Sequence, residues 1–119
     1  MNIKNFQISK DSTLREALEL IDLNKSGTIF VINIESIVIG VATDGDIRRK
    51  LLEGVQLDDG LENIYNANFI SYDIATSRET LIKKLDTVVS VIPLLDSEGR
   101  LIDIASRKHY PITKEEKIF

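Results

Sequence analysis

The pattern of apolar and polar positions changes period within residues 37–52, and this change predicts a strand that runs directly into a helix. Residues 37–43 carry no charge and are mostly β-branched, which is typical of a strand buried on both faces. Residues 43–46 are predicted to form the tight turn between the two elements. From Asp44 onward the spacing becomes helical, with apolar residues at Ile47, Leu51 and Leu52.

The segment before residue 37 predicts one helix and two strands. Thr13 and Glu16 have the spacing of a capping box, in which the Thr hydroxyl and the Glu carboxylate each accept a hydrogen bond from an exposed N–H group of the helix start. Residues 6–8 predict a short strand, and residues 28–33 predict a buried strand. The helix between them has apolar residues at Leu14, Ala17, Leu18 and Ile21.

The second half of the chain repeats this series of elements. Thr76 and Glu79 predict a second capping box, 63 residues after Thr13 and Glu16. Residues 91–96 fall on the earlier buried strand at the same offset. A chance similarity would not keep caps and strands in phase, so we interpret the pattern as an internal duplication.

The offset is constant from Thr13 onward, and it places Leu81 on Leu18. Before Thr13 the register slips by one residue to 62, which places Ile70 on Ile8. The predicted organisation is therefore two repeats of similar length joined by a connector, at residues 1–55, 56–69 and 70–119.

The connector is the more polar part of the chain. Asp58 and Asp59 have the character of helix caps. They predict a short helix that carries Leu61, Ile64 and Tyr65.

Composition narrows the classes of protein that this pattern can form. The chain has 119 residues, of which 43% are hydrophobic and 29% charged, as in an ordinary globular domain. A net charge of −4 does not favour nucleic acid, and no apolar run approaches the ~20 residues of a membrane span. The sequence has no cysteine and a single histidine, His109, which excludes disulfides and a histidine-rich metal site. We therefore expect a cytoplasmic protein that binds neither nucleic acid nor membrane.

The turn at residues 43–46 carries the candidate chemistry. A helix start exposes unpaired N–H groups and the positive end of the helix dipole, and such a start binds phosphate. Gly40, Thr43 and Asp46 stand here in the string G-V-A-T-D-G-D-I-R-R. This string resembles the signature of a cystathionine-β-synthase-like (CBS) domain, whose pattern has Gly, Ser/Thr and Asp at these spacings.

The resemblance to CBS domains implies both a fold and a ligand. CBS domains occur as tandem pairs, so we expect an α/β fold of two pseudosymmetric strand-helix-strand-strand-helix repeats with small mixed sheets. Nucleotide sites lie in the clefts between such repeats. The implied ligand is an adenine nucleotide (AMP, ADP or ATP) that regulates, and the resemblance implies no required cofactor, no catalytic residue and no metal.

The resemblance also implies a role for individual residues. Asp46 is expected to hold the ribose, and Thr43 with the N–H groups after it, including that of Gly45, is expected to hold the phosphate end. Arg49 is a further candidate for the phosphate. The adenine is expected to lie against strand residues near Ile8, Thr28 and Phe30.

The same residues also fit purely structural roles. Thr43 fits a helix N-cap and Asp46 an acid in a first helical turn, and both roles are compatible with ligand binding. Arg48 and Arg49 have the spacing of ion pairs with the acids of that turn. Gly40 fits a strand position that another part of the backbone approaches closely.

The second repeat departs from the signature. At the offset of 63, Asp103 stands in the place of Gly40 and His109 in the place of Asp46, while Ser106 keeps a hydroxyl. A neutral imidazole has one donor and one acceptor, so it cannot accept paired hydrogen bonds from two ribose hydroxyls as a carboxylate does. The second site is therefore expected to be degenerate. Its turn is either a solvated basic loop or a source of positive charge for a phosphate held by the other half, through Arg107, Lys108 and His109.

The last part of the chain bears on what the module serves. Pro111 disfavours helix at Tyr110, and residues 114–119 are short and charged. The string T-D-G-D-I-R-R resembles CBS pairs attached to sugar-phosphate isomerases and to sugar-nucleotide transferases of the mannose-1-phosphate guanylyltransferase type. The start at Met1 and the end soon after Pro111 fit an N-terminal module of such an enzyme. We therefore expect a regulatory module that is not itself an enzyme and has an attached or partner catalytic domain.

Two alternatives stay open. CBS pairs commonly form flat dimers, so the chain also fits a ligand-free dimerisation module, and a homodimer is expected. Asp44 and Asp46 resemble the Asp-x-Asp of haloacid-dehalogenase-like phosphatases. That family has Gly-Thr or Gly-Val after the second Asp, whereas Ile47 and Arg48 follow here.

Overall fold

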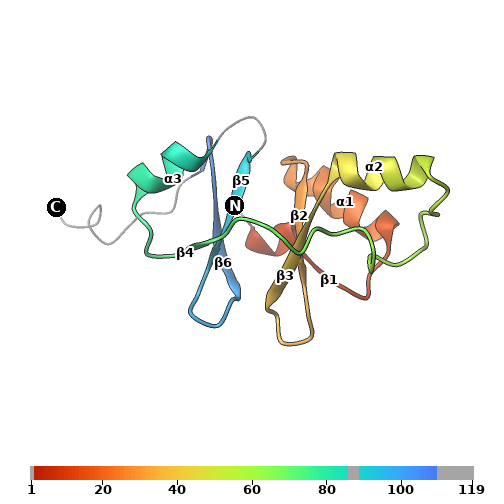
Figure 1. The fold of residues 1–119 in the computed structure, drawn as a ribbon, viewed down its shortest axis with the longest axis horizontal. Helices are drawn as coiled ribbons and strands as arrows, with labels where there is room; N and C mark the ends of the chain where they lie inside the picture. Colours follow the sequence, from red (N-terminus) through yellow and green to blue (C-terminus); the bar gives the residue numbers. More distant parts are fainter. Residues whose placement is uncertain (1, 86–88, 110–119) are drawn as a thin grey trace. The chain divides into compact units, whose positions relative to one another are not determined.

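The computed structural model describes residues 2–85 and 89–109 of the chain (Figure 1). The chain divides into two compact units, Met1–Phe69 and Ile70–Phe119. Each unit has a three-stranded mixed sheet with helix beside it. The predicted mixed α/β fold is therefore confirmed.

The first unit begins with a 3-10 turn, η1 (Ile3–Phe6), and then alternates strands and helices. Its middle strand β2 pairs in parallel with β1 and antiparallel with β3. The elements after η1 are β1 (Gln7–Ser9), α1 (Leu14–Asn24), β2 (Thr28–Ile32), β3 (Val38–Thr43) and α2 (Asp44–Leu52).

The two helices of the first unit begin at the predicted caps. The Thr13 hydroxyl accepts a hydrogen bond from the Glu16 N–H, and the Glu16 carboxylate accepts one from the Thr13 N–H. The amphipathic spacing of α1 turns its buried residues toward one face of the sheet. The core on this face is formed by Ile8, Leu14, Ala17, Ile21, Ile29, Val31, Ala42, Ile47, Leu61 and Ile64.

The second unit repeats the topology of the first. Its strand order is β4-β5-β6, with β4 parallel and β6 antiparallel to β5. A smaller core is formed by Leu81, Leu85, Ile92, Leu94 and Ala105. Its elements are β4 (Tyr72–Asp73), α3 (Arg78–Lys84), β5 (Val91–Leu95) and β6 (Leu101–Ser106).

The two hairpins agree residue by residue at the offset of 63. Thr28 pairs with Thr43 in the first unit, and Val91 pairs with Ser106 in the second. The register shifts between residues 31 and 32 in one hairpin and between residues 94 and 95 in the other. Because an irregularity in the same place is set by the strand sequences, the shared shift supports the predicted duplication.

The predicted offset is wrong before the hairpin of the second unit. Tyr72 pairs with Leu94 as Ile8 pairs with Val31, so the first strand is offset by 64 residues rather than 62. Ile70 therefore does not take the place of Ile8.

The second capping box is also wrong. The N-cap of α3 is Ser77, whose hydroxyl accepts a hydrogen bond from the Thr80 N–H at 3.3 Å. The helix thus starts one residue later than predicted, because Ser77 competes successfully with Thr76 for the cap. Leu81 consequently takes the place of Ala17 rather than that of Leu18.

The connector has no helix. Asp59 does not cap one, since its carboxylate accepts a hydrogen bond from the Gln56 N–H at 2.8 Å and its carbonyl accepts one from the Leu14 N–H at 3.1 Å. Turns carry the segment instead. Leu61 and Ile64 are still buried in the first core, so the predicted apolar positions pack without a helical backbone.

None of the helices among the described residues is long and apolar enough to cross a membrane. The predicted break at Pro111 and the charged residues 114–119 lie outside the part that the structure describes.

Candidate functional site

Strand β3 passes into α2 through a single residue, Thr43. The Thr43 hydroxyl accepts a hydrogen bond from the Asp46 N–H, and the Asp46 carboxylate accepts one from the Thr43 N–H, both at 3.1 Å. This reciprocal capping box confirms the predicted N-cap. It also fixes the carboxylate of Asp46 beside the end of β3.

The first turn of α2 has few backbone donors left for a ligand. The Asp44 N–H donates to the carbonyl oxygen of Gly27 at 2.9 Å, and the Asp46 N–H is taken by Thr43. The N–H of Gly45 is the one that neither contact occupies. A Cβ at Gly45 would have its nearest neighbours at 3.9 and 4.0 Å, so the backbone here is open to an approaching group.

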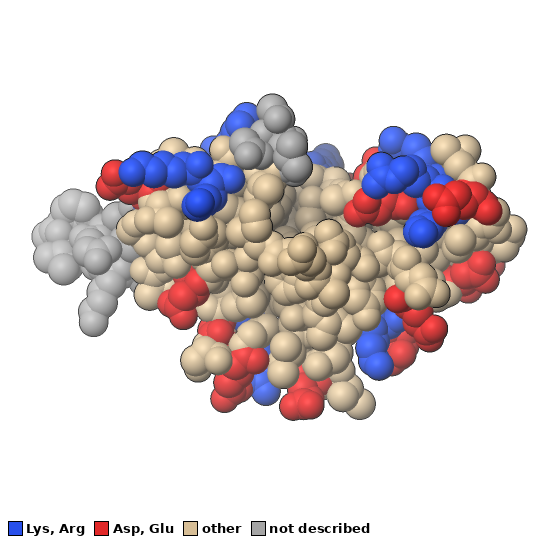
Figure 2. Space-filling model, viewed as in Figure 1, with Lys and Arg blue, Asp and Glu red and all other residues tan. Residues whose placement is uncertain are grey.

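The acids of the turn are neutralised by the arginines that follow them. Arg48 Nη2 lies 2.5 Å from an oxygen of Asp44, and Arg49 Nη2 lies 2.5 Å from Oδ1 of Asp46. The predicted pairing is confirmed. Figure 2 shows basic and acidic side chains intermingled over α2. Because both arginines are well exposed, each pair contributes little stability and is readily exchanged.

The structure divides the predicted adenine contacts between the two faces of the sheet. Thr28 pairs directly with Thr43, so their side chains lie on one face, and Phe30 follows on that face two residues along. Ile8 pairs with Val31, and both belong to the core on the helix-covered face. The side chain of Ile8 therefore lies on the opposite face from Thr28 and Phe30.

Gly40 lies where the connector approaches β3 closely, as the sequence predicted for a strand glycine. A Cβ at this position would overlap the ring of Tyr65, which packs against the first core. The next residue, Asn66, exchanges two backbone hydrogen bonds with Val41, at 2.7 and 3.0 Å. The connector is thereby attached to β3 just before the candidate turn.

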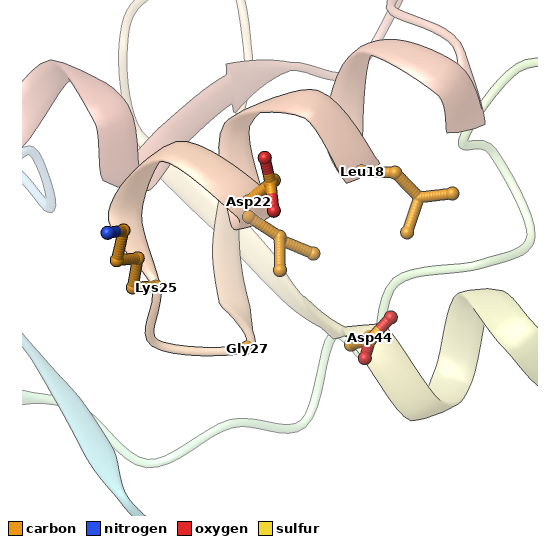
Figure 3. A pocket seen from close by; sticks show the side chains of 6 residues that line it. Leu18, Asp22, Lys25, Gly27 and Asp44 are labelled. Atoms are coloured by element: carbon orange, nitrogen blue, oxygen red, sulfur yellow. The ribbon is translucent and has the colours of Figure 1, made fainter.

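A cavity of about 530 Å³ opens between α1 and the start of α2 (Figure 3), a volume within the ~300–1,000 Å³ of small-molecule pockets. None of the predicted contact residues lines it. Sequence reasoning missed this cavity and the loop beside it, although the Asn-Lys-Ser-Gly string before a buried strand is a turn signal. Its lining is formed by Leu18, Ile21, Asp22, Lys25, Gly27 and Asp44.

The corresponding turn of the second unit closes on itself. Ser106 and His109 exchange two backbone hydrogen bonds, at 2.8 and 3.2 Å, so the chain reverses where the first unit begins a helix. The Ser106 hydroxyl accepts a further bond from the Lys108 N–H. The backbone of Ser106 is therefore occupied by its own turn, and no α-helix begins between it and residue 109.

The part of the chain that the structure describes offers no cluster of side chains for binding a metal ion. No group of three or more His, Cys, Asp or Glu side chains that could hold an ion occurs among these residues. The two acids of the first turn bind arginines instead.

Comparison with known proteins places this geometry in a known class. Residues 1–53 match the family described as CBS domain. The whole fold is similar to the CBS domains of a transcriptional regulator from Streptococcus pneumoniae, with 16% identity, a TM-score of 0.73, and 91% of this chain and 88% of that chain covered. The fold is thus that of CBS-domain proteins.

Two further structures extend the comparison. An uncharacterized conserved protein from Pyrococcus horikoshii is 26% identical, with a TM-score of 0.69 over 91% of this chain and 83% of that chain. CbpB in complex with c-di-AMP is 16% identical, with a TM-score of 0.68 over 86% of this chain and 71% of that chain. No curated protein matches the sequence.

Proposed function

We propose that this chain is a cytoplasmic regulatory module that binds an adenine nucleotide at the turn formed by residues 43–46. It has no catalytic activity of its own. Its ligand controls an attached or partner catalytic domain, for which a sugar-nucleotide transferase is the proposed candidate. The observation that carries the proposal is the capped turn of Thr43 and Asp46, within the segment that matches the CBS family.

The proposed contacts use groups that the turn leaves available. The Asp46 carboxylate accepts one hydrogen bond from the Thr43 N–H and one from Arg49. A carboxylate has about four acceptor positions. Ribose hydroxyls donate to the remaining positions. The exposed Arg49 exchanges its carboxylate partner for a phosphate, and the Gly45 N–H donates to that phosphate at the positive end of α2.

The adenine is proposed to lie on the face of the sheet that carries Thr28 and Phe30. Ile8 contributes through its backbone, because its side chain is part of the opposite core. The c-di-AMP bound to CbpB, a protein of similar fold, supports a ligand that contains adenine. The closed turn at Ser106 supports one site per chain.

A thermal-shift screen of the chain with AMP, ADP, ATP, c-di-AMP, GTP and a nucleotide sugar tests the proposal. A ligand at 100 times its Kd stabilises the folded state by about 2.7 kcal/mol, so adenine nucleotides should raise the Tm and GTP should not. A preference for GTP or the nucleotide sugar would contradict the proposed adenine site.

The second candidate function is a ligand-free dimerisation module. It is favoured by Leu23 on α1 and Leu52 at the end of α2, whose residues are 63% and 83% exposed. An apolar side chain left exposed on each of the two helices would be covered by a second copy. A dimer by small-angle scattering, together with no thermal shift from any nucleotide, would select this function over the first.

A further inference from the structure

The side chain of Asn24 holds the loop between α1 and β2. Its Nδ2 group donates to the carbonyl oxygens of Asn5 at 2.8 Å and Thr28 at 2.9 Å. Its Oδ1 atom accepts from the Ser26 N–H at 2.9 Å and from the Ser26 hydroxyl at 2.8 Å. These four bonds use the full capacity of an amide side chain.

The backbone conformation of the loop explains why it needs this side chain. Lys25 and Gly27 have positive φ angles of 58° and 77°, so the chain turns sharply between helix and strand and forms few regular backbone bonds. Ser26 adds a second bracket, since its hydroxyl also accepts from the Thr28 N–H at 3.2 Å. Asn24 and Ser26 together supply the bonds that such a turn leaves unmade.

The loop contacts the candidate turn directly. The carbonyl oxygen of Gly27 accepts a hydrogen bond from the Asp44 N–H at 2.9 Å. Thr28, the first residue of β2, pairs with Thr43. The Asn24 side chain therefore bonds to Thr28. This residue follows Gly27, which contacts α2, and it is the strand partner of Thr43, the N-cap of α2.

We propose that Asn24 is a positioning residue for the nucleotide site. It sets the start of β2 at Thr28 and, through Gly27, the first turn of α2. A nucleotide that spans Thr28 and the turn needs both at fixed separation, and preorganisation of this kind contributes to affinity. This inference rests on the proposed function and adds a residue that does not touch the ligand.

The chain offers a matched control at the other end of β2. Asn33 brackets the hairpin loop in the same way, since its Oδ1 atom accepts from the N–H groups of Glu35 at 2.9 Å and Ile37 at 3.0 Å. That loop lies at the opposite end of the hairpin from the start of α2 (Figure 1). Asn33 is thus a loop-forming asparagine with no link to the turn.

The experiment compares Asn24→Ala and Asn33→Ala in the full chain by calorimetric titration with AMP, ADP, ATP and c-di-AMP, well below the Tm of each variant. Asn24→Ala should weaken binding of the preferred nucleotide about tenfold, the change expected if the binding-competent arrangement of Thr28 and the turn falls to about a tenth of the population. Asn33→Ala should change it less than about twofold while lowering the Tm. Without ligand, the amide NMR signals of Asp44 and Gly45 should move in Asn24→Ala and stay in place in Asn33→Ala.

Binding by the unmodified chain tests the proposed function, and the comparison of the two variants tests the role of Asn24. If the unmodified chain binds none of the four nucleotides, both the proposed function and the role of Asn24 are overturned. If it binds one of them and the two variants weaken it equally, only the role of Asn24 is overturned. Should Asn24→Ala fail to fold, Ser26→Ala removes one bracket of the same loop, and unchanged affinity in that variant would overturn the role as well.

Discussion

The Nε2 atom of His109 lies 3.0 Å from a carboxylate oxygen of Asp103, and these residues stand where the first repeat has Asp46 and Gly40. In the first repeat the glycine admits the ring of Tyr65, and the acid caps a helix. In the second repeat the acid is Asp103 on the strand, and it binds the side chain of His109 in the closed turn. Equivalent positions of the two repeats thus make different contacts.

One nucleotide should bind per chain, because the helix start that is proposed as the first site is replaced by the closed turn at Ser106 in the second unit. Isothermal titration calorimetry with the preferred nucleotide should give a stoichiometry near one. Two equivalent sites would show that this turn opens to a ligand. The control is the Asp46→Ala variant, in which the single binding event should be weakened.

Asp46→Ala should weaken nucleotide binding by at least about tenfold, since hydrogen bonds to a charged group contribute about 1.5–3 kcal/mol each. The variant also loses half of the capping box, so the free energy of unfolding should fall by about 1 kcal/mol. Asp44→Ala removes an equal charge and an equal arginine pair from the same turn, with no proposed ribose contact. Equal losses of affinity in the two variants would indicate general electrostatics instead of ribose recognition.

Gly40→Ala should destabilise the first unit by about 1–3 kcal/mol, because its methyl group would overlap the ring of Tyr65 in a packed core. Gly45→Ala, which adds the same methyl group in open space within α2, should stabilise the helix by about 0.5–1 kcal/mol. Urea unfolding of both variants measures the difference. A loss of stability no larger for Gly40→Ala than for Gly45→Ala would show that the Tyr65 ring does not pack against Gly40.

Ser77→Ala should lower the stability of the second unit by about 1 kcal/mol, as expected for loss of an N-cap hydroxyl. Thr76→Ala, one residue earlier, should change it by a few tenths of a kcal/mol. Thermal unfolding followed by circular dichroism compares the two. The opposite order of effects would restore Thr76 as the cap.

The strands, the Thr13 capping box and the Thr43 N-cap could be predicted because they depend on residues close together in the sequence. The change of period at Asp44 and the repeated strands at residues 91–95 needed only local patterns. The start of α3 was missed by one residue, because Thr76 and Ser77 are both good caps and propensity alone does not choose between neighbours. The helix predicted at Asp58 failed because the carbonyl oxygens of Leu57 and Asp59 accept hydrogen bonds from the distant N–H groups of Arg15 and Leu14.

The candidate turn was predictable for a similar reason. Thr43 and Asp46 form a contact across three residues, and their spacing is visible in the sequence. The loop of Asn24 was not singled out, because its bonds to Asn5 and Thr28 depend on three elements meeting at one place. The opposite orientations of Ile8 and Phe30 follow from strand register, which a single short strand does not determine.

Because Tyr65 and Asn66 attach to β3, the segment that carries the repeated signature is shorter than the segment that folds as the first unit. The signature that repeats ends in the first turn of α2, but the first unit is complete only when the connector has returned to cover Gly40 and to add Leu61 and Ile64 to the core. A fragment cut at residue 55 would carry the whole signature and yet leave the edge strand β3 without Tyr65 and Asn66.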